Sequence, residues 1–292
     1  MTVNQLLSRK AAASLLRSAG VRPSSRLGQN FLVDRTVLDT IVAEVRRDAP
    51  VEILEIGAGL GTVTRELAAV ARGVIAVEID RRLSAVLKRT MRGLDNVEVL
   101  RQDILNFDIS ARFKECPVLI VGNIPYRITA PILKHLVQHR TAISAAILLA
   151  QREVAEKIEN SPGPAGTALG VLVRAYADFH MIKRVSKGSF YPVPAVDSIL
   201  WRLSFLESPR FSAAPEVFFS MVRRLYGKRR KMVRSALRGI LPPDRLKGAI
   251  RAAGIAPTSR GESLSFAELD RLALVIERIA QPDRCGKGTW AQ

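Results

Sequence analysis

The chain has 292 residues, of which 48% are hydrophobic, so it can form one large α/β domain and a smaller one, each with a core. Its 45 Lys and Arg against 27 Asp and Glu give a formal net charge of +18, which favours a polyanionic partner and makes nucleic acid the leading candidate. We find no apolar run of membrane-spanning length and no lipidation motif, and Cys116 and Cys285 form no Cys-x-x-Cys pair, which excludes a structural zinc site and indicates a reducing compartment.

The first acidic residue is Asp34, and the segment before it is rich in Arg, Lys, Ala, Ser and Leu. This composition is also typical of an organelle transit peptide. The segment can instead form a native helix that ends at Gly20, with an apolar stripe on one side and basic residues facing RNA. The stripe consists of Leu6, Leu7, Leu15 and Leu16. We favour the native helix.

A glycine-rich turn follows the first predicted strand of the sheet. Residues 51–56 form this strand, and the turn over residues 57–61 leads into a helix. Glycine lets the backbone bend sharply and approach a ligand that a Cβ would obstruct. The second strand, residues 73–77, ends on Glu78, where a doubly wound fold places an acid on ribose hydroxyls. The pattern therefore predicts a nucleoside-bearing cofactor.

The spacing of the glycines distinguishes between cofactors. A dinucleotide fingerprint reads Gly-x-Gly-x-x-Gly, whereas this turn reads Gly-x-Gly-x-Gly and follows Glu55. The tighter turn resembles the first motif of S-adenosylmethionine-dependent methyltransferases. It disfavours a nicotinamide dehydrogenase, as does the absence of a poised His or Lys. Asp103, after a third strand over residues 97–100, can accept from the adenine amino group of the cofactor.

The fourth predicted strand is an apolar, β-branched run that ends at Asn123-Ile124-Pro125-Tyr126, where open α/β sheets bind their ligands. Asn123 offers a carbonyl that can accept from an amino group, and Pro125 stiffens the turn. Tyr126 presents a flat face on which a nucleobase can stack. An ordinary Asn-Pro turn is the alternative for four residues alone. The tetrapeptide matches the Asn-Pro-Pro-Tyr-like motif of amino-methyltransferases that act on adenine.

A proline-rich segment over residues 190–198 lies between a fifth strand, residues 142–150, and a last strand, residues 199–205. Two prolines hold this segment extended, so that it can place Phe190 in the pocket opposite Tyr126. A phenylalanine in the core is the alternative.

The C-terminal part is basic. After a linker at residues 209–215, a single helix is predicted from Phe218 to about Ile240, and a capping signal at residues 263–269 predicts a closing helix. The first of these helices carries eight basic residues and no acid, which favours a phosphate-binding surface over a merely solvated face. These residues are Arg223, Arg224, Lys228, Arg229, Arg230, Lys231, Arg234 and Arg238.

Together the motifs resemble the bacterial small-subunit (16S) ribosomal RNA adenine N6,N6-dimethyltransferases, from about residue 8 to about residue 280. The matching segments are residues 27–32, 55–61, Glu78, Asp103, 123–126, 151–158, 190–198, 229–231 and 262–264. The resemblance implies a Rossmann-like class I S-adenosylmethionine-dependent methyltransferase domain, of α/β class with a seven-stranded mixed sheet, over residues 1–207. It also implies a small all-α, basic, rRNA-binding domain over residues 208–292 that ends in a loose tail.

The resemblance also implies the reaction: two methyl groups pass from S-adenosylmethionine to N6 of each of two adjacent adenosines in the loop of the last helix of 16S rRNA. The substrate would be an immature 30S ribosomal subunit, and the enzyme a cytoplasmic monomer. The family's cofactor contacts fall on Asn30, Leu32, Gly57, Glu78, Asp103 and Asn123. Its target-base pocket falls on Asn123, Pro125, Tyr126 and Phe190. No metal is expected, since His135, His139 and His180 lie outside every motif.

The expected catalysis depends on geometry. The lone pair of adenine N6 is delocalised into the ring, so the amine is a poor nucleophile. Hydrogen bonds accepted by Asn123 Oδ1 and by a backbone carbonyl near Ile124 or Pro125 would favour a pyramidal nitrogen. Stacking between Tyr126 and Phe190 would align it with the methyl donor.

Two rival functions remain open at this point. One is the large-subunit (23S) rRNA adenine dimethyltransferase of macrolide resistance, against which Gly28 and the long basic C-terminal part favour the small-subunit enzyme. The other is a ribosome-assembly factor that keeps the fold without the activity. Glu78, Asp103 and Asn123 are intact, which argues against lost catalysis.

Overall fold

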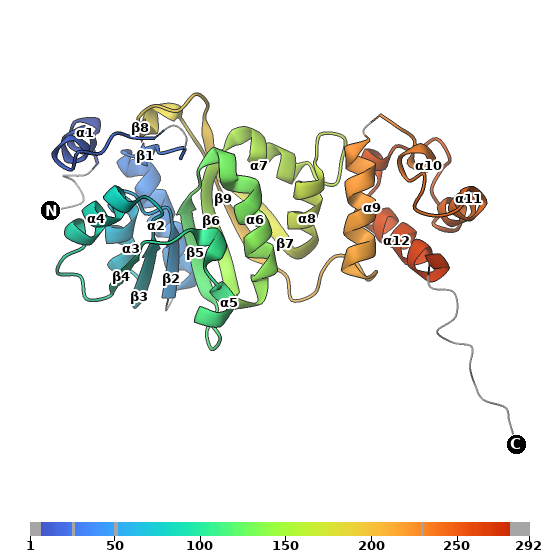
Figure 1. Cartoon of the computed structure of the whole chain (residues 1–292), viewed down its shortest axis with the longest axis horizontal. Helices are drawn as coiled ribbons and strands as arrows, with labels where there is room; N and C mark the ends of the chain where they lie inside the picture. Colours follow the sequence, from blue (N-terminus) through green and yellow to red (C-terminus); the bar gives the residue numbers. More distant parts are fainter. Residues whose placement is uncertain (1–6, 25–26, 50–51, 229, 281–292) are drawn as a thin grey trace, which may run out of the picture. The chain divides into compact units, whose positions relative to one another are not determined.

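The computed structural model describes residues 7–24, 27–49, 52–228 and 230–280. Leu6, Arg229 and Cys285, which enter the predictions above, lie outside this part of the chain. The fold consists of two compact units (Figure 1). The first contains the described residues of Met1–Ala155 and Asp178–Phe205, and the second those of Glu156–Ala177 and Leu206–Gln292.

The first unit is built on a seven-stranded mixed sheet with the strand order β4-β3-β2-β5-β6-β9-β7. Strands β4, β3, β2, β5 and β6 are parallel to their neighbours, and β9 is antiparallel to β6. The strands are β2 (Glu52–Ile56), β3 (Gly73–Val77), β4 (Val97–Leu100), β5 (Val118–Asn123), β6 (Ile143–Gln151), β7 (Ala177–Val185) and β9 (Ser198–Phe205). The predicted Rossmann-like mixed sheet is confirmed.

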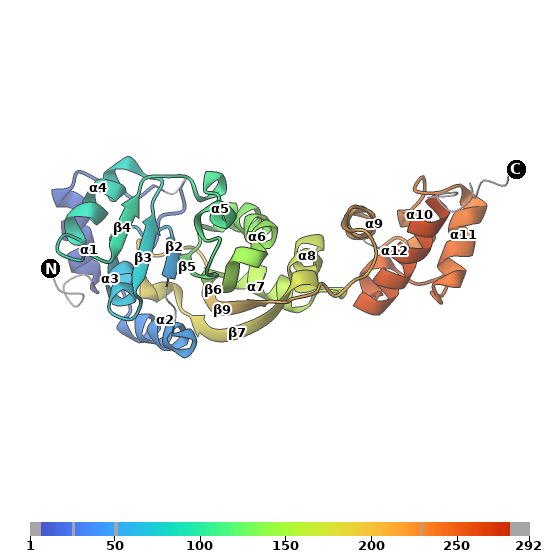
Figure 2. The ribbon, with the colours of Figure 1, turned by 90° about the horizontal axis from the view of Figure 1, so that it is seen from below.

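Helices cover both faces of this sheet, with α2 and α6 on opposite sides (Figures 1 and 2). Valines, leucines and isoleucines of α2 pack with apolar residues of β2, β3, β5 and β6 in one buried cluster. The helices are α1 (Arg9–Ser18), α2 (Arg35–Asp48), α3 (Thr62–Ala68), α4 (Arg81–Thr90), α5 (Ile109–Arg112), α6 (Thr129–Gln138) and α7 (Arg152–Glu159), the last of which continues into the second unit.

The predicted native helix near the N-terminus is present as α1. Leu15 and Leu16 are buried in a cluster with Leu83 and Val86 of α4, so this segment packs as part of the fold. Gly20 follows the helix with a φ of +63°, a left-handed conformation that glycine adopts at little cost.

A short two-stranded antiparallel sheet joins distant parts of the first unit. It pairs β1 (Phe31–Leu32) with β8 (Phe190–Tyr191), so that Leu32 lies opposite Phe190. Val33 N–H also donates to Ser189 O at 2.9 Å. This pairing brings the predicted cofactor segment against the proline-rich segment.

The second unit is helical. It contains α8 (Ala168–Tyr176), α9 (Pro215–Gly227), α10 (Val233–Ala236), α11 (Pro243–Ala252) and α12 (Phe266–Ala280). Rings from α8, α9 and the segment before α9 pack together, with the Phe211 and Phe218 centroids 4.3 Å apart and Tyr176 edge-on to Phe211. Residues 156–177 therefore pack with the second unit, whereas the sequence analysis assigned them to the first domain. The division into a methyltransferase domain up to residue 207 and an rRNA-binding domain from residue 208 stays a prediction.

The predicted single helix over residues 218–240 is wrong, because α9 ends at Gly227 and α10 begins only at Val233. Between them Arg230 has a left-handed φ of +69°. Val233 N–H donates to Ser259 O at 2.9 Å, and Met232 forms an isolated bridge with Arg260. These long-range backbone bonds replace the intrahelical ones.

The closing helix begins as predicted. Ser265 Oγ accepts from Glu268 N–H at 3.3 Å, and Glu268 Oε2 accepts from Ser265 N–H at 2.8 Å, which is a capping box. Within the described residues, no helix has both the length and the apolar character needed to cross a lipid bilayer.

Candidate active site

A pocket lies at the carboxyl ends of the parallel strands in the first unit. Protein atoms leave about 1080 Å³ of space there, part of it open to solvent. The pocket brings together every predicted cofactor residue and two residues of the predicted target-base pocket, Asn123 and Pro125. Together these residues are Asn30, Leu32, Gly57, Glu78, Asp103, Asn123 and Pro125.

The glycine turn after β2 forms one wall of the pocket. Gly57 and Gly59 have φ values of +73° and +58°, which L side chains rarely adopt. A Cβ at Gly59 would lie 3.0 Å from Cδ1 of Phe31. The turn needs glycine both for its backbone conformation and for its packing against the segment before α2.

Glu78 holds this turn from the tip of β3. Its Oε2 accepts from Gly59 N–H at 2.9 Å, and its Oε1 accepts from Asp80 N–H at the same distance. The carboxylate is 6% exposed, and burial raises its pKa although the hydrogen bonds from Asp80 and Gly59 oppose the rise. Each carboxylate oxygen keeps a second lone pair, so Glu78 can also accept from a ligand.

Asp103 lies after β4 at the same edge. Its Oδ1 accepts from Leu105 N–H at 3.0 Å and caps the short helix that follows, and this bond fixes the side chain. Its other oxygen has no hydrogen-bond partner in the described part of the chain, so it is available to an amino group in the pocket.

Asn123 ends β5, and its amide orientation is fixed. Its Nδ2 donates to Asn30 O at 2.7 Å, and Asn30 Nδ2 in turn donates to Gly28 O at 3.2 Å. Because only the NH₂ group can donate to a carbonyl, Asn123 Oδ1 is the atom left over. Among the described residues, Oδ1 has no partner.

Gly28 explains how the segment before β1 reaches this site. Its φ is +63°, and a Cβ there would lie 3.0 Å from Pro125 Cβ. The close approach lets Asn30 O meet Asn123, which is 93 residues away in the chain. Any larger residue at position 28 would push the two segments apart.

The rest of the tetrapeptide divides its roles. Ile124 is 1% exposed and its N–H donates to Leu149 O at 2.8 Å, so its side chain belongs to the core. Pro125 O accepts from Ile128 N–H at 3.1 Å and from Thr129 Oγ1 at 3.2 Å. Of the two carbonyls that we considered as acceptors, Ile124 O is therefore the one that keeps its lone pairs free within the described structure.

The two predicted stacking residues differ in their surroundings. Tyr126 is half-buried, and its hydroxyl lies 3.0 Å from Ser198 Oγ, which fixes the ring. Burial raises the pKa of Tyr126, with a smaller contribution from the charge of Asp197. Phe190 is 1% exposed and packs in the main apolar cluster, so it has the core position that the sequence analysis gave as the alternative. The rings of Tyr126 and Phe190 are both outside the pocket lining.

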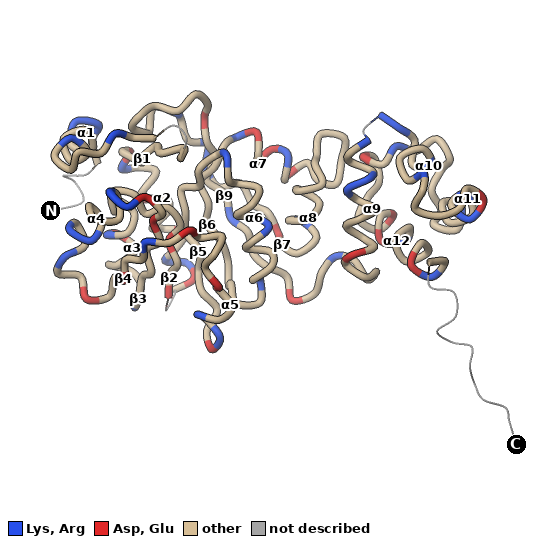
Figure 3. Tube along the Cα trace, viewed as in Figure 1, with Lys and Arg blue, Asp and Glu red and all other residues tan. Residues whose placement is uncertain are grey.

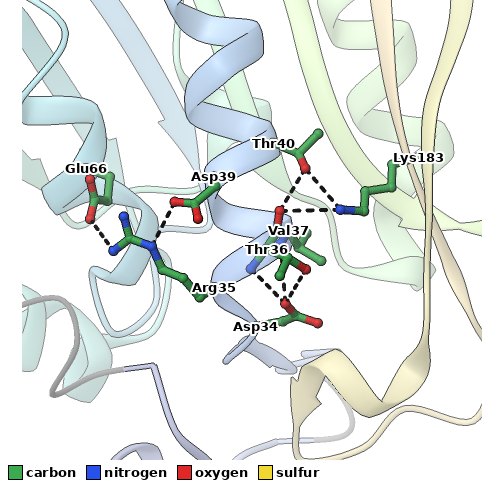
Figure 4. A network of polar contacts seen from close by, with 8 residues as sticks. All are labelled: Asp34, Arg35, Thr36, Val37, Asp39, Thr40, Glu66 and Lys183. Carbon is green, nitrogen blue, oxygen red and sulfur yellow. Dashed lines mark hydrogen bonds and ion pairs between the residues drawn. The ribbon is translucent and has the colours of Figure 1, made fainter.

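Asp34 anchors the segment between β1 and α2 (Figure 4). Its Oδ1 accepts from the N–H of Thr36 at 2.9 Å, and its Oδ2 accepts from Ser189 Oγ at 2.7 Å. Burial opposes ionisation, but the hydrogen bonds from Ser189, Thr36 and Val37 outweigh it and lower the pKa of Asp34. Lys183 of β7 also contacts this helix, since its Nζ donates to Oγ1 of Thr40 in α2 at 3.2 Å (Figure 4).

Two further polar residues belong to the site although the sequence analysis gave them no role. Glu55 lines the pocket, is 3% exposed, and its Oε2 has no hydrogen-bond partner among the described residues. Burial raises the pKa of Glu55 to about 7; the hydroxyl of Thr64 opposes this rise and the charge of Glu78 adds to it. Gln29 donates to Asp80 Oδ2 at 3.3 Å. The signal for Glu55 was an acid between Leu54 and Ile56, two residues before the glycine turn.

These residues fit a cofactor that combines a nucleoside with positive charge. Three acids, Glu55, Glu78 and Asp103, line a pocket in a protein whose formal net charge is +18. The buried, unpartnered oxygen of Glu55 requires a donor to offset its desolvation. S-adenosylmethionine carries an ammonium group, a sulfonium, ribose hydroxyls and an adenine amine, which match such acceptors.

Comparisons with known proteins agree with this site. The model of the family described as "Ribosomal RNA adenine dimethylase" matches residues 21–278. The chain is 34% identical to Ribosomal RNA small subunit methyltransferase A of Clostridioides difficile over 94% of this chain and 98% of that protein. It is 38% identical to the protein of the same name from Clostridium acetobutylicum over 88% of this chain and 95% of that protein.

Solved structures show the same architecture. The 23S rRNA methyltransferase ErmE superimposes with a TM-score of 0.67 and 29% identity, over 85% of this chain and all of that one. A dimethyladenosine transferase from Plasmodium falciparum shares the fold with a TM-score of 0.73 and 23% identity, over 84% of this chain and 96% of that one. The chain therefore belongs to the ribosomal RNA adenine dimethylase family and is an S-adenosylmethionine-dependent methyltransferase of the Rossmann-like class I fold.

Proposed function

We propose that this enzyme transfers two methyl groups to N6 of each of two adjacent adenosines in the loop of the 3′-terminal helix of 16S rRNA. The substrate is an immature 30S subunit, and the enzyme acts as a monomer in the cytoplasm, where ribosomes assemble. Relatives named as small-subunit methyltransferases, 34% and 38% identical, support this choice. The neighbour named as a 23S rRNA enzyme is 29% identical, which gives the large-subunit alternative less support.

The observation that carries the proposal is the orientation of Asn123. Its Nδ2 donates to Asn30 O, which leaves Oδ1 as an acceptor, and the backbone carbonyl of the next residue, Ile124, is a second acceptor. Two acceptors suit the two N–H groups of an adenine amine. When Asn123 Oδ1 and Ile124 O accept these two hydrogen bonds, they favour a pyramidal N6 on the adenine. The lone pair of N6 is then available to attack the methyl group.

Bound S-adenosylmethionine supplies a methyl group on a positively charged sulfonium. Glu78 and Asp103 would hold its ribose and adenine, and Gly57 and Leu32 would contact it along the turn and β1. Glu55 would accept from its ammonium group. The site needs no strong base, because the amine loses its proton readily once it has been alkylated.

Tyr126 would stack on the target base. Its hydroxyl contact with Ser198 holds the ring in place, and stacking of this kind is worth about 1–3 kcal/mol per base. The role of Phe190 as a second stacking ring stays a prediction, and its burial in the core means that it would support Leu32 through the β1–β8 pairing even without that role.

The second unit would bind rRNA through the basic segment over residues 223–238, which runs from the last turns of α9 to just after α10. Lys and Arg recur along this stretch of the chain (Figure 3). Their side chains are exposed, and none of them forms an ion pair within the described residues. The described members are Arg223, Arg224, Lys228, Arg230, Lys231, Arg234 and Arg238; Arg229 lies outside the described part. Exposed, unpaired cations of this density suit a phosphate backbone.

The test compares Asn123→Ala with Asn96→Ala. Asn96 Nδ2 also donates to backbone carbonyls, those of Ala68 and Ala71, but it lies outside the pocket lining. We expect Asn123→Ala to lower methyl transfer by about 10²–10³-fold, by analogy with loss of one stabilising hydrogen bond at a reacting group, while RNA binding persists. Asn96→Ala should keep wild-type activity.

Mass mapping of methylated adenosines identifies the substrate. Immature 30S and 50S particles are incubated separately with enzyme and S-adenosylmethionine. Dimethylation of two adjacent adenosines near the 3′ end of 16S rRNA supports the proposal. Methylation of 23S rRNA alone contradicts the choice of subunit, and wild-type turnover by Asn123→Ala contradicts the role of the amide.

A further inference from the structure

Helices α1 and α4 form a basic surface in the first unit, and none of its basic residues lines the pocket. Ala12, Leu15 and Leu16 of α1 share a buried apolar cluster with Leu83 and Val86 of α4, so the two helices pack through these faces. The Lys and Arg side chains of both helices are turned to solvent.

All charged residues in these two segments are cations. Residues 7–24 and residues 81–94 contain Lys and Arg but no Asp or Glu (Figure 3). The side chains of these Lys and Arg residues are exposed. We call this set the α1–α4 basic ridge. It consists of Arg9, Lys10, Arg17, Arg22, Arg81, Arg82, Lys88, Arg89 and Arg92. None of the nine forms an ion pair with a described residue.

Two members of the ridge are held in place by backbone carbonyls. Arg82 donates to Gly20 O at 3.0 Å, which ties α4 to the end of α1. Arg9 donates to Gly188 O at 2.7 Å, next to the proline-rich segment. Backbone carbonyls fix these guanidinium groups without neutralising them, so their positive charge remains available.

The ridge also connects directly to the pocket. Asp80 caps α4 by accepting from the N–H groups of Arg82 and Leu83, and it accepts from Gln29 of the cofactor segment. Its own N–H donates to Glu78. A polyanion that lies along α4 therefore lies close to the cofactor side of the pocket.

A solvated face is the ordinary explanation for charges on a helix, but here the charges do not compensate one another. The charged residues of α4 are Arg81, Arg82, Lys88 and Arg89, so no acid on this helix offsets them. Arg81 and Lys88 lie on the same side of α4, about 10 Å apart along its axis. A row of unpaired cations at such distances suits a polyphosphate chain better than scattered small anions.

We propose that the α1–α4 basic ridge is a second rRNA-binding surface, which contacts the phosphate backbone of the substrate outside the target adenosines. This inference rests on the proposed function for the identity of the RNA. It assigns the ridge to affinity and positioning, and the pocket to chemistry.

The test uses two matched double variants. Lys88→Gln with Arg89→Gln removes two cations from the last turn of α4, and Arg46→Gln with Arg47→Gln removes two from the last turn of α2. Binding of each protein to immature 30S particles and to their rRNA is measured between 50 and about 300 mM salt, a range over which such contacts weaken strongly. Thermal unfolding and S-adenosylmethionine affinity are measured in parallel as controls of folding.

We expect the slope of log binding constant against log salt to become shallower by about 1.5 in the α4 variant, or about 0.7–0.9 for each lost phosphate contact. KM for the particle should rise with the dissociation constant, while kcat at saturating substrate, S-adenosylmethionine affinity and the melting temperature should stay at wild-type values. The α2 variant should keep the wild-type slope.

A wild-type salt slope in the α4 variant overturns the proposal, as does an equal change in both variants. Binding to vesicles of phosphatidylglycerol and phosphatidylcholine is measured as well. If the α4 variant loses vesicle binding but keeps RNA binding, the ridge is a membrane surface instead. Failure of the proposed function is distinguishable, because the wild type would then bind rRNA with the expected slope and leave it unmethylated.

Discussion

Replacement of Glu55 by Gln should change how both stability and cofactor affinity depend on pH. Glu55 is 3% exposed, lines the pocket, and has one oxygen without a hydrogen-bond partner among the described residues. Burial raises its pKa from 4.5 to about 7. The free protein therefore favours the protonated acid at this position, whereas the ammonium group of S-adenosylmethionine favours the carboxylate.

The size of the effect follows from the pKa. A rise from 4.5 to about 7 corresponds to about 3 kcal/mol, since each pKa unit is worth about 1.4 kcal/mol. The pKa of Glu55 is higher in the folded protein than in the unfolded chain. The contribution of Glu55 to the free energy of unfolding is therefore fully present below pH 4.5 and is lost as the pH rises through 7. Glu55→Gln keeps the neutral form at every pH and removes this dependence.

Urea denaturation of the cofactor-free protein between pH 4.5 and 8 measures the first effect. The free energy of unfolding of the wild type should fall by about 3 kcal/mol relative to Glu55→Gln across this range. Glu52→Gln is the control, because Glu52 is on the same strand but outside the pocket lining, and it should follow the wild type.

Calorimetric titration with S-adenosylmethionine measures the second effect. Wild-type affinity should rise with pH, by up to tenfold per unit, and level off above about pH 7, because binding then no longer requires loss of a proton. Glu55→Gln should bind more weakly and with a flatter profile. Parallel pH profiles for wild type and Glu55→Gln, in stability and in affinity, would refute the reasoning.

Three further substitutions test the frame of the site. Asp34→Ala removes the cap of α2 and should cost about 1–2 kcal/mol in urea denaturation; an unchanged midpoint contradicts this. Tyr126→Phe loses only the hydroxyl contact with Ser198 and should lower methyl transfer less than tenfold. Tyr126→Ala also loses stacking worth about 1–3 kcal/mol and should be slower. Equal rates of methyl transfer for the two variants would exclude a stacking role. Gly28→Ala combines a left-handed φ of +63° with a contact at 3.0 Å from Pro125 Cβ, and should weaken cofactor binding in calorimetry by about tenfold through 1–2 kcal/mol of strain.

Much of the site could be predicted from local sequence. The glycine turn and Glu78 directly follow strands, Asn123 ends one, and Asp103 lies three residues after another. The carboxyl ends of parallel strands meet at one edge of a sheet. Their convergence on one pocket therefore follows from strand order, which the alternation of strands and helices indicates. The capping box before α12 is likewise a local pattern, since its partners are three residues apart.

Other features depended on contacts between residues far apart in the chain. The helix predicted over residues 218–240 is broken because Val233 and Met232 bond to Ser259 and Arg260, and no pattern within the segment reports such partners. Phe190 is buried because β8 pairs with β1, about 160 residues earlier by chain position.

The sequence by itself determined the fold class, the family, the cofactor and the residues around the pocket, because these follow from motifs whose members lie next to strands. Only the tertiary structure decided which oxygen of Asn123 faces the substrate, which carbonyl stays free, and that Glu55 has a pKa of about 7. Amide orientation and pKa are set by the surrounding hydrogen-bond partners and by burial. Those surroundings exist only in the folded protein, where Asn30 O accepts from Asn123 and the apolar core buries β2.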